Sequence, residues 1–165
     1  GGYTLSLPEE DRTLMARKKM MADMIGLLGG RAAEELVFDD ITSGASNDLE
    51  RVTRMARAMV TRLGMSNQLG PMVYGQKEEL IFLGREISEQ RDYSEAVVQE
   101  IDKEVRSLVN EAYEKARAIL IEYRDKLDEV AKRLLEVETI SREEFERIFP
   151  PPVPKNSGTP VPMSV

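Results

Sequence analysis

Residues 85–149 contain neither glycine nor proline, the two residues that most often end helices and start turns. Apolar residues recur there every three or four positions from Val97 to Ile119, and a second apolar series runs from Leu127 to Leu135. This spacing is typical of amphipathic helices. It predicts a long helix over residues 94–123 and another over residues 127–135, and it favours a helical fold over a β-sandwich.

The composition of the chain changes at residue 150. Before it, Ser141 and Glu144 form the S-x-x-E pattern of a capping box, which predicts one last helix. After it, six of the eight prolines fall within residues 150–165. We therefore expect a helical domain over residues 1–149, followed by a Pro-rich disordered tail over residues 150–165.

The N-terminal half combines shorter elements. Alternating residue types over residues 3–7 predict the end of a strand, and Pro8 followed by three acidic residues predicts a helix start. Helices are expected over residues 8–28, 31–37 and 49–63, and Gly29-Gly30 separates the first from the second. Residues 65–86 are expected to form a loop with one or two short strands. The predicted fold class is mainly α, a helical bundle with a short N-terminal strand remnant.

Three residue types are absent from the chain: His, Cys and Trp. Without imidazole or thiol, the chain by itself cannot build a Ser-His-Asp triad, a cysteine nucleophile or a complete zinc site of the usual His/Cys type. The formal net charge of −7 argues against a nucleic-acid partner. Four arginines lie mostly off the apolar face of the predicted 49–63 helix and are interpreted as a solvated or subunit-facing surface: Arg51, Arg54, Arg57 and Arg62.

Two pairs of adjacent carboxylates occur, at Glu34-Glu35 and at Asp39-Asp40. Acid–base catalysis needs two carboxyl groups whose pKa values are well separated. Most adjacent pairs are instead solvated surface or turn residues, and the pattern alone favours that interpretation.

The segment that runs from Thr42 to Asp48, TSGASND, has two interpretations. In the first, Ser46 or Asn47 is the N-cap of the following helix, and Asp48 faces the positive end of the helix dipole. In the second, Asp48 binds a metal, or supports a metal ligand, together with nitrogen ligands from another segment. Residue preferences alone favour the capping interpretation.

Several blocks, taken in order, carry a family resemblance. They are GGYTLSLPEED, LGGRAAEELVF, TSGASNDLERVTRMARAMV, LGMSNQLGPMVYG, FLGREI and YSEAVVQEIDKEV. Together they resemble the C-terminal part of the peptidase domain of FtsH-type ATP-dependent zinc metalloproteases, over about residues 1–149. The resemblance implies that this region is a partial metallopeptidase domain of the helical FtsH type.

The resemblance also implies a zinc site and assigns residues to it. Members of this family hold one zinc per subunit with the two histidines of an H-E-x-x-H helix and with a later Asp, which corresponds to Asp48. A Glu of the AAEE block lies near the ligand helix and supports it, and Glu34 is the better match, with Glu35 second. An edge strand would align an extended substrate by backbone pairing, and here it is expected to include Tyr3, Thr4 and Leu5.

The same resemblance implies the setting in which such a chain works. The parent protein would be a homo-hexamer that degrades unfolded or membrane proteins, and this segment would supply the third zinc ligand and ring-forming helices. ATP and Mg would bind an upstream ATPase module. The location would be the cytoplasmic face of the bacterial inner membrane, or the equivalent organelle membrane.

The segment departs from the family pattern at its start. It opens Gly-Gly-Tyr-Thr, as an internal piece of a longer protein would, and H-E-x-x-H is expected a few dozen residues before Gly1. Two zinc ligands, the general base, the ATPase module and the membrane anchor would then all lie upstream. The segment alone is expected to be inactive as a peptidase because it has no His. The alternatives are an inactive family member and a helical oligomerisation or interaction module without proteolysis.

Overall fold

The computed structural model describes residues 15–75 and 93–151. Within them the only β-type pairing is an isolated bridge between Ser66 and Gly70, so the prediction of a mainly α fold is confirmed. The strand expected over residues 3–7 and the tail expected after residue 150 lie almost wholly outside the described residues. The elements are α1 (Arg17–Phe38), η1 (Ser43–Ala45), α2 (Ser46–Thr61), α3 (Glu95–Glu122), α4 (Arg124–Val137) and α5 (Arg142–Ile148).

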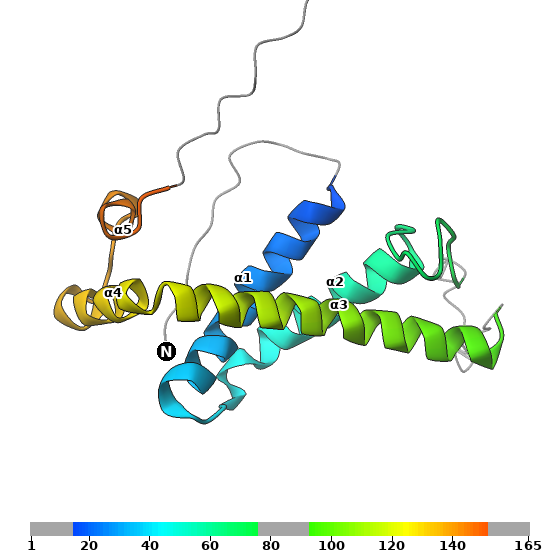
Figure 1. Cartoon of the computed structure of the whole chain (residues 1–165), viewed down its shortest axis with the longest axis horizontal. Coiled ribbons are helices and arrows are strands. Elements are labelled where there is room, and N and C mark those ends of the chain that lie inside the picture. Colours follow the sequence, from blue (N-terminus) through cyan, green and yellow to red (C-terminus); the bar gives the residue numbers. More distant parts are fainter. Residues whose placement is uncertain (1–14, 76–92, 152–165) are drawn as a thin grey trace, which may run out of the picture. The chain divides into compact units, whose positions relative to one another are not determined.

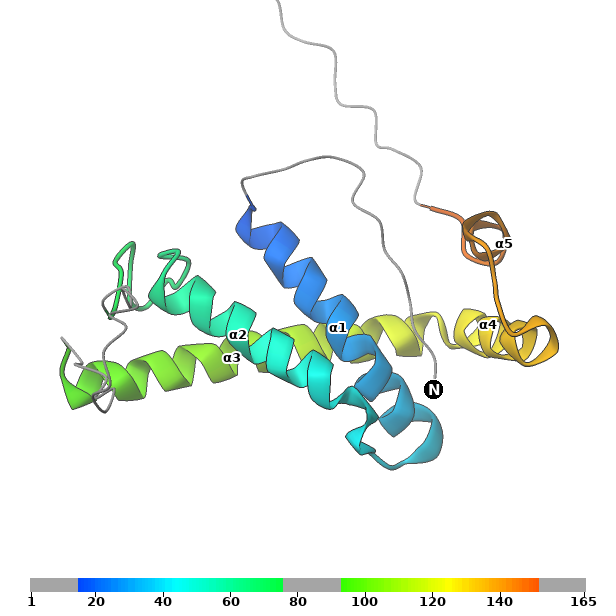
Figure 2. The ribbon, with the colours of Figure 1, turned by 180° about the vertical axis from the view of Figure 1, so that it is seen from behind.

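The chain divides into two compact units, one up to Ile121 and one from Glu122 onward. In the first unit, α1 and α2 form a helical hairpin, and α3 packs across it (Figures 1 and 2). The apolar faces predicted from the spacing meet in its core, where flexible methionine side chains fill much of the seam between α1 and α2. The core residues with the lowest exposure are Met24, Leu28, Ala32, Val52, Ala56, Met59, Val60, Ile101 and Ala112.

Helix α1 differs from the prediction in two respects. It begins at Arg17, after an extended Ala16, so the predicted helix does not run through this position; its expected first residues, 8–14, lie outside the described residues. It then continues through Gly29 and Gly30 to Phe38, so the predicted interruption there is wrong. The physical reason is burial on both sides of the glycine pair: Leu28 and Ala32, one helical turn apart, are 2% and 1% exposed, and packing outweighs the modest cost of glycine in a helix.

The loop after α2 is fixed by a close backbone contact and a buried hydroxyl. Gly64 has φ +58°, and a Cβ there would lie 2.9 Å from Pro71 Cα. Ser66 is 5% exposed and donates to Glu104 Oε2 of α3 at 2.6 Å, while it accepts from the backbone N–H groups of Gln68 and Leu69. The described part of the region expected to contain short strands, up to residue 75, is therefore an ordered loop tied to α3.

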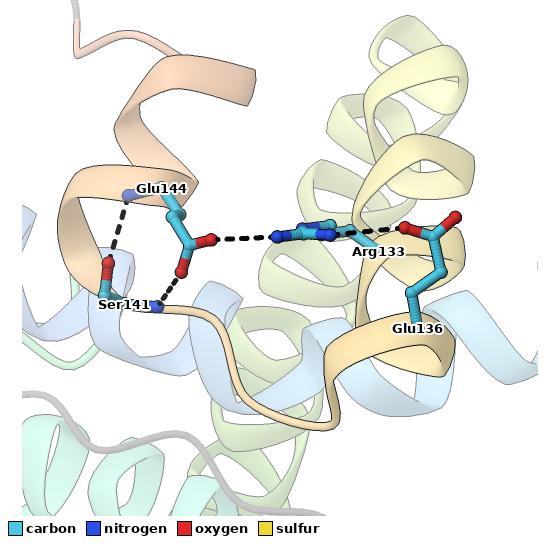
Figure 3. A network of polar contacts seen from close by, with 4 residues as sticks. All are labelled: Arg133, Glu136, Ser141 and Glu144. Atoms are coloured by element: carbon cyan, nitrogen blue, oxygen red, sulfur yellow. Dashed lines mark hydrogen bonds and ion pairs between the residues drawn. The ribbon is translucent and has the colours of Figure 1, made fainter.

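In the second unit, ion pairs of Arg133 connect α4 to α5 (Figure 3). Its guanidinium binds Glu136 at 3.3 Å and Glu144 at 3.2 Å. The predicted capping box is confirmed: Ser141 Oγ accepts from the Glu144 N–H, and the Glu144 carboxylate accepts from the Ser141 N–H. Glu144 thus caps α5 and anchors it to α4 at the same time.

Candidate metal-ligand turn and its support

Asp48 lies in the first turn of α2, next to the 3-10 helix η1. Its side chain is 43% exposed, and Arg51 Nη1 is 3.9 Å from Asp48 Oδ1, which is too long for a hydrogen bond. The carboxylate is therefore accessible to solvent, and it lies where the helix dipole favours a negative charge. The expected caps are wrong: Ser46 and Asn47 are helical residues, and the N-cap of α2 is Ala45, without a side-chain hydrogen bond.

The side-chain cap belongs instead to Thr42, one element earlier. Its hydroxyl accepts from the Gly44 N–H at 3.2 Å and so caps η1. The 3-10 helix directly precedes α2 in the chain, and the Ser46 N–H at the start of α2 donates to the Ser43 carbonyl. A side-chain preference read along the sequence finds a polar cap but cannot tell which of two consecutive helices it serves.

Glu34 contacts this turn. Both of its carboxylate oxygens accept from the Thr42 hydroxyl, at 3.2 and 3.1 Å, and Oε2 also accepts from the Thr42 N–H at 3.3 Å. Glu35, the next residue, lies toward α3, where its carboxylate accepts from the Tyr113 hydroxyl. The two members of this pair therefore serve different parts of the fold, and Glu34 is the one that reaches the segment before Asp48.

The other acidic pair closes the hairpin. Asp39 ends α1 in the left-handed conformation, with φ 52°, and Asp40 accepts from the Ile41 N–H at 2.7 Å. These are turn residues, as the pattern favoured.

The arginines of α2 are partly used within the first unit. Arg57 Nη2 lies 3.3 Å from Asp102 Oδ1 of α3, and Arg62 donates to the Gly75 carbonyl at 3.0 Å. At least two of the four therefore hold α2 to its own surroundings, while their side chains stay at the surface.

Among the described residues, Asp48 is the candidate for one position of a zinc site. Neither of their ranges contains a group of three or more His, Cys, Asp or Glu side chains placed to hold a metal. Asp48 fits the role of a single oxygen ligand because its carboxylate is accessible and has no short bond to a cation. The expected substrate strand, Tyr3, Thr4 and Leu5, lies outside the described residues.

Comparison with known proteins decides the family. The model of peptidase family M41 matches residues 1–148. The chain belongs to peptidase family M41. It is 50% identical to the ATP-dependent zinc metalloprotease FtsH 1 of Thermomicrobium roseum over 98% of this chain, 52% identical to FtsH of Thermotoga maritima over 90%, and 55% identical to FtsH of Chloroflexus aggregans over 90%.

The chain corresponds to only part of the length of its curated relatives. The chain spans about a quarter of the length of these curated relatives: 25%, 24% and 23%. In the described residues, no helix is both long and apolar enough to cross a membrane. The family assignment therefore concerns the peptidase region, and the matched residues 1–148 include Asp48.

The sequence patterns assign no role to two residues that bind the glutamates of the AAEE block: Thr42 in the candidate turn and Tyr113 on α3. Thr42 opens the TSGASND segment, and Tyr113 lies within the predicted 94–123 helix. Each acts through a residue far away in the sequence, and each partner is a glutamate of the same AAEE block. The block itself was the available signal, because two adjacent half-buried carboxylates need two sets of donors.

Proposed function

We propose that this chain is part of the peptidase region of an ATP-dependent zinc metalloendopeptidase, with Asp48 as the third zinc ligand. The observation that carries the proposal is the accessible Asp48 carboxylate in the first turn of α2, inside a segment that matches peptidase family M41. Histidines from outside this chain would provide the other two ligands.

Within this proposal, the role of this chain is to present one carboxylate in a fixed place. The α1–α2 hairpin is closely packed near the turn, because Val52, one turn after Asp48, is fully buried and Ala32 is 1% exposed. A bound zinc with an open coordination position would lower the pKa of a water molecule and polarise the scissile carbonyl. The chain's own contribution would be the orientation of the Asp48 oxygen atoms.

The wider setting is proposed from the same similarity. The full-length protein would be a homo-hexamer that hydrolyses ATP with Mg in a separate module, is anchored in a membrane, and degrades unfolded polypeptides. The strand containing Tyr3, Thr4 and Leu5 would pair with an extended substrate backbone. Cleavage aligned in this way would depend little on substrate side chains.

The test is Asp48→Asn in the full-length protein, with Asp128→Asn as the matched control. Asp128 is also an exposed helical carboxylate, but it pairs with Arg124 on α4. We expect Asp48→Asn to abolish casein digestion and to lower bound zinc, with ATP hydrolysis retained, whereas Asp128→Asn changes neither activity. Digestion by Asp48→Asn at the wild-type rate would contradict the ligand assignment. A wild-type protein that hydrolyses ATP but never digests casein would favour the inactive family member.

A further inference from the structure

The turn that precedes Asp48 is tied to α1 by Thr42. The Thr42 hydroxyl lies between two partners: it donates to the Glu34 carboxylate at 3.1–3.2 Å and accepts from the Gly44 N–H at 3.2 Å. The first partner belongs to α1 and the second to η1. The Thr42 hydroxyl, together with the Thr42 N–H that also donates to Glu34, thus connects α1 to η1.

The geometry around Gly44 shows how close this contact is. A Cβ at Gly44 would lie 3.2 Å from Thr42 Oγ1 and 3.7 Å from Glu34 Oε1. A side chain there would press on the same oxygen that caps η1. The turn therefore brings backbone, hydroxyl and carboxylate together at van der Waals distance.

The connection continues from Gly44 to Asp48 through regular structure. The buried Ala45, 8% exposed, ends η1, and the Ser46 N–H bonds back to the Ser43 carbonyl. Asp48 follows in the first turn of α2. Because η1 and α2 are consecutive and meet at Ala45, the N-cap of α2, a displacement of η1 would shift the first turn of α2, which carries Asp48.

We propose that Thr42 is a positioning residue for Asp48: its hydroxyl locks η1 onto the Glu34 carboxylate and thereby fixes the direction in which the first turn of α2 presents its carboxylate. This inference rests on the proposed function, since the ligand role of Asp48 is proposed there. It adds Thr42 to the residues on which zinc binding depends and gives Glu34 a physical role, that of anchoring the turn without touching the metal.

The consequence for metal binding follows from preorganisation. Without the hydroxyl, the Thr42 N–H still reaches Glu34 at 3.3 Å, but the Gly44 N–H loses its acceptor. The turn then samples more orientations, and zinc binding must select one of them. Loss of a group that orients a metal ligand typically weakens metal affinity by about 10- to 100-fold.

The experiment compares three variants of the full-length protein: Thr42→Val, which removes the hydroxyl at nearly constant shape, Thr42→Ser, which keeps it, and Thr53→Val as the control. Thr53 is also exposed and donates only within α2, to the Leu49 carbonyl at 2.8 Å. The readouts are Zn²⁺ affinity, by competition with a chromophoric chelator, and amide hydrogen exchange at Gly44 in the metal-free protein.

We expect Thr42→Val to weaken Zn²⁺ binding at least about tenfold and to speed exchange at Gly44, with Thr42→Ser and Thr53→Val close to wild type. In the Thr42→Val background, Glu34→Ala removes only the remaining bond from the Thr42 N–H, so it should weaken binding less than Glu34→Ala does in the wild-type protein. Wild-type zinc affinity in Thr42→Val would overturn the proposal, whatever happens to thermal stability.

Asp48→Asn separates this failure from failure of the proposed function. If Asp48→Asn weakens Zn²⁺ binding and Thr42→Val does not, only the positioning role is wrong. If neither variant changes the affinity, Asp48 is not a ligand and both proposals fall.

Discussion

The Tyr113 hydroxyl of α3 donates a hydrogen bond to the Glu35 carboxylate of α1, 78 positions earlier in the chain. Both side chains are half-buried, and Ala112 and Ala116, on either side of Tyr113 along α3, are fully or almost fully buried. The bond therefore lies at the edge of the core shared by α1, α2 and α3. It fixes the position of α3 on the hairpin, independently of the neighbouring Glu34.

Tyr113→Phe should destabilise the chain by about 1–2 kcal/mol, since a half-buried carboxylate would lose its hydroxyl donor. The measurement is the midpoint of urea unfolding. In a Glu35→Ala background the same change should cost much less. Equal losses in both backgrounds would mean that the bond contributes nothing.

Gly64→Ala should be markedly destabilising, and Gly70→Ala gives its matched control. Both glycines have positive φ, +58° and +72°, so alanine costs about 1 kcal/mol at either position. Only at Gly64 would the new Cβ also meet backbone, 2.9 Å from Pro71 Cα, whereas nothing lies within 4 Å at Gly70. We expect a clearly larger fall in the unfolding midpoint for Gly64→Ala. Equal effects would contradict the close approach.

Gly30→Ala should stabilise the chain by about 0.5–1 kcal/mol, because α1 continues through this position and alanine is the better helix former. Nothing lies within 4 Å of the Cβ that the substitution would add. Thermal unfolding followed by circular dichroism at 222 nm checks this. A loss of stability would show that the helix is interrupted here in solution.

The packing of α5 on α4 should weaken in acid. The Ser141 N–H and then the Arg133 guanidinium hold the pKa of the Glu144 carboxyl below its usual value. Because the folded pKa lies below the unfolded one, this stabilisation is complete above the usual Glu range, near pH 4.3, and disappears as the pH falls through the lower folded value.

The ring contact between Tyr123 and Phe149, with centroids 4.9 Å apart, reports on that packing through aromatic proton shifts. These shifts should move toward unfolded values in a titration below about pH 4.3, and Glu144→Gln should remove most of that dependence. A titration that is the same in Glu144→Gln and wild type would contradict the role of Glu144.

Local spacing predicted most of the core. The apolar residues of α2 repeat at helical intervals and are fully buried, because an amphipathic helix turns its apolar face toward the core. They are Val52, Ala56, Met59 and Val60. The capping box at Ser141 was equally predictable, since both of its bonds join residues three positions apart. Interactions within one turn are visible in the sequence.

The predictions were wrong or incomplete where contacts between different elements of the fold determine the structure. Gly29-Gly30 looked like a helix end, but burial of the flanking Leu28 and Ala32 against other helices keeps α1 continuous. Thr42 gained its role from a carboxylate eight positions earlier, and Tyr113 from one 78 positions earlier. The ligand role proposed for Asp48 came from family resemblance, because an isolated carboxylate at a helix start looks the same whether it binds a metal or only the helix dipole.

The methionines packed between α1 and α2 also determine how this hairpin responds to oxidation. Met24 and Met59 are fully buried, while Met15 and Met72 are 46% and 58% exposed. An oxidant will therefore convert the exposed sulfur atoms to sulfoxides first and reach the buried pair only when the two helices separate. A sulfoxide formed there would place a polar group among buried apolar side chains, which costs free energy and opposes the return of the two helices to their packed position.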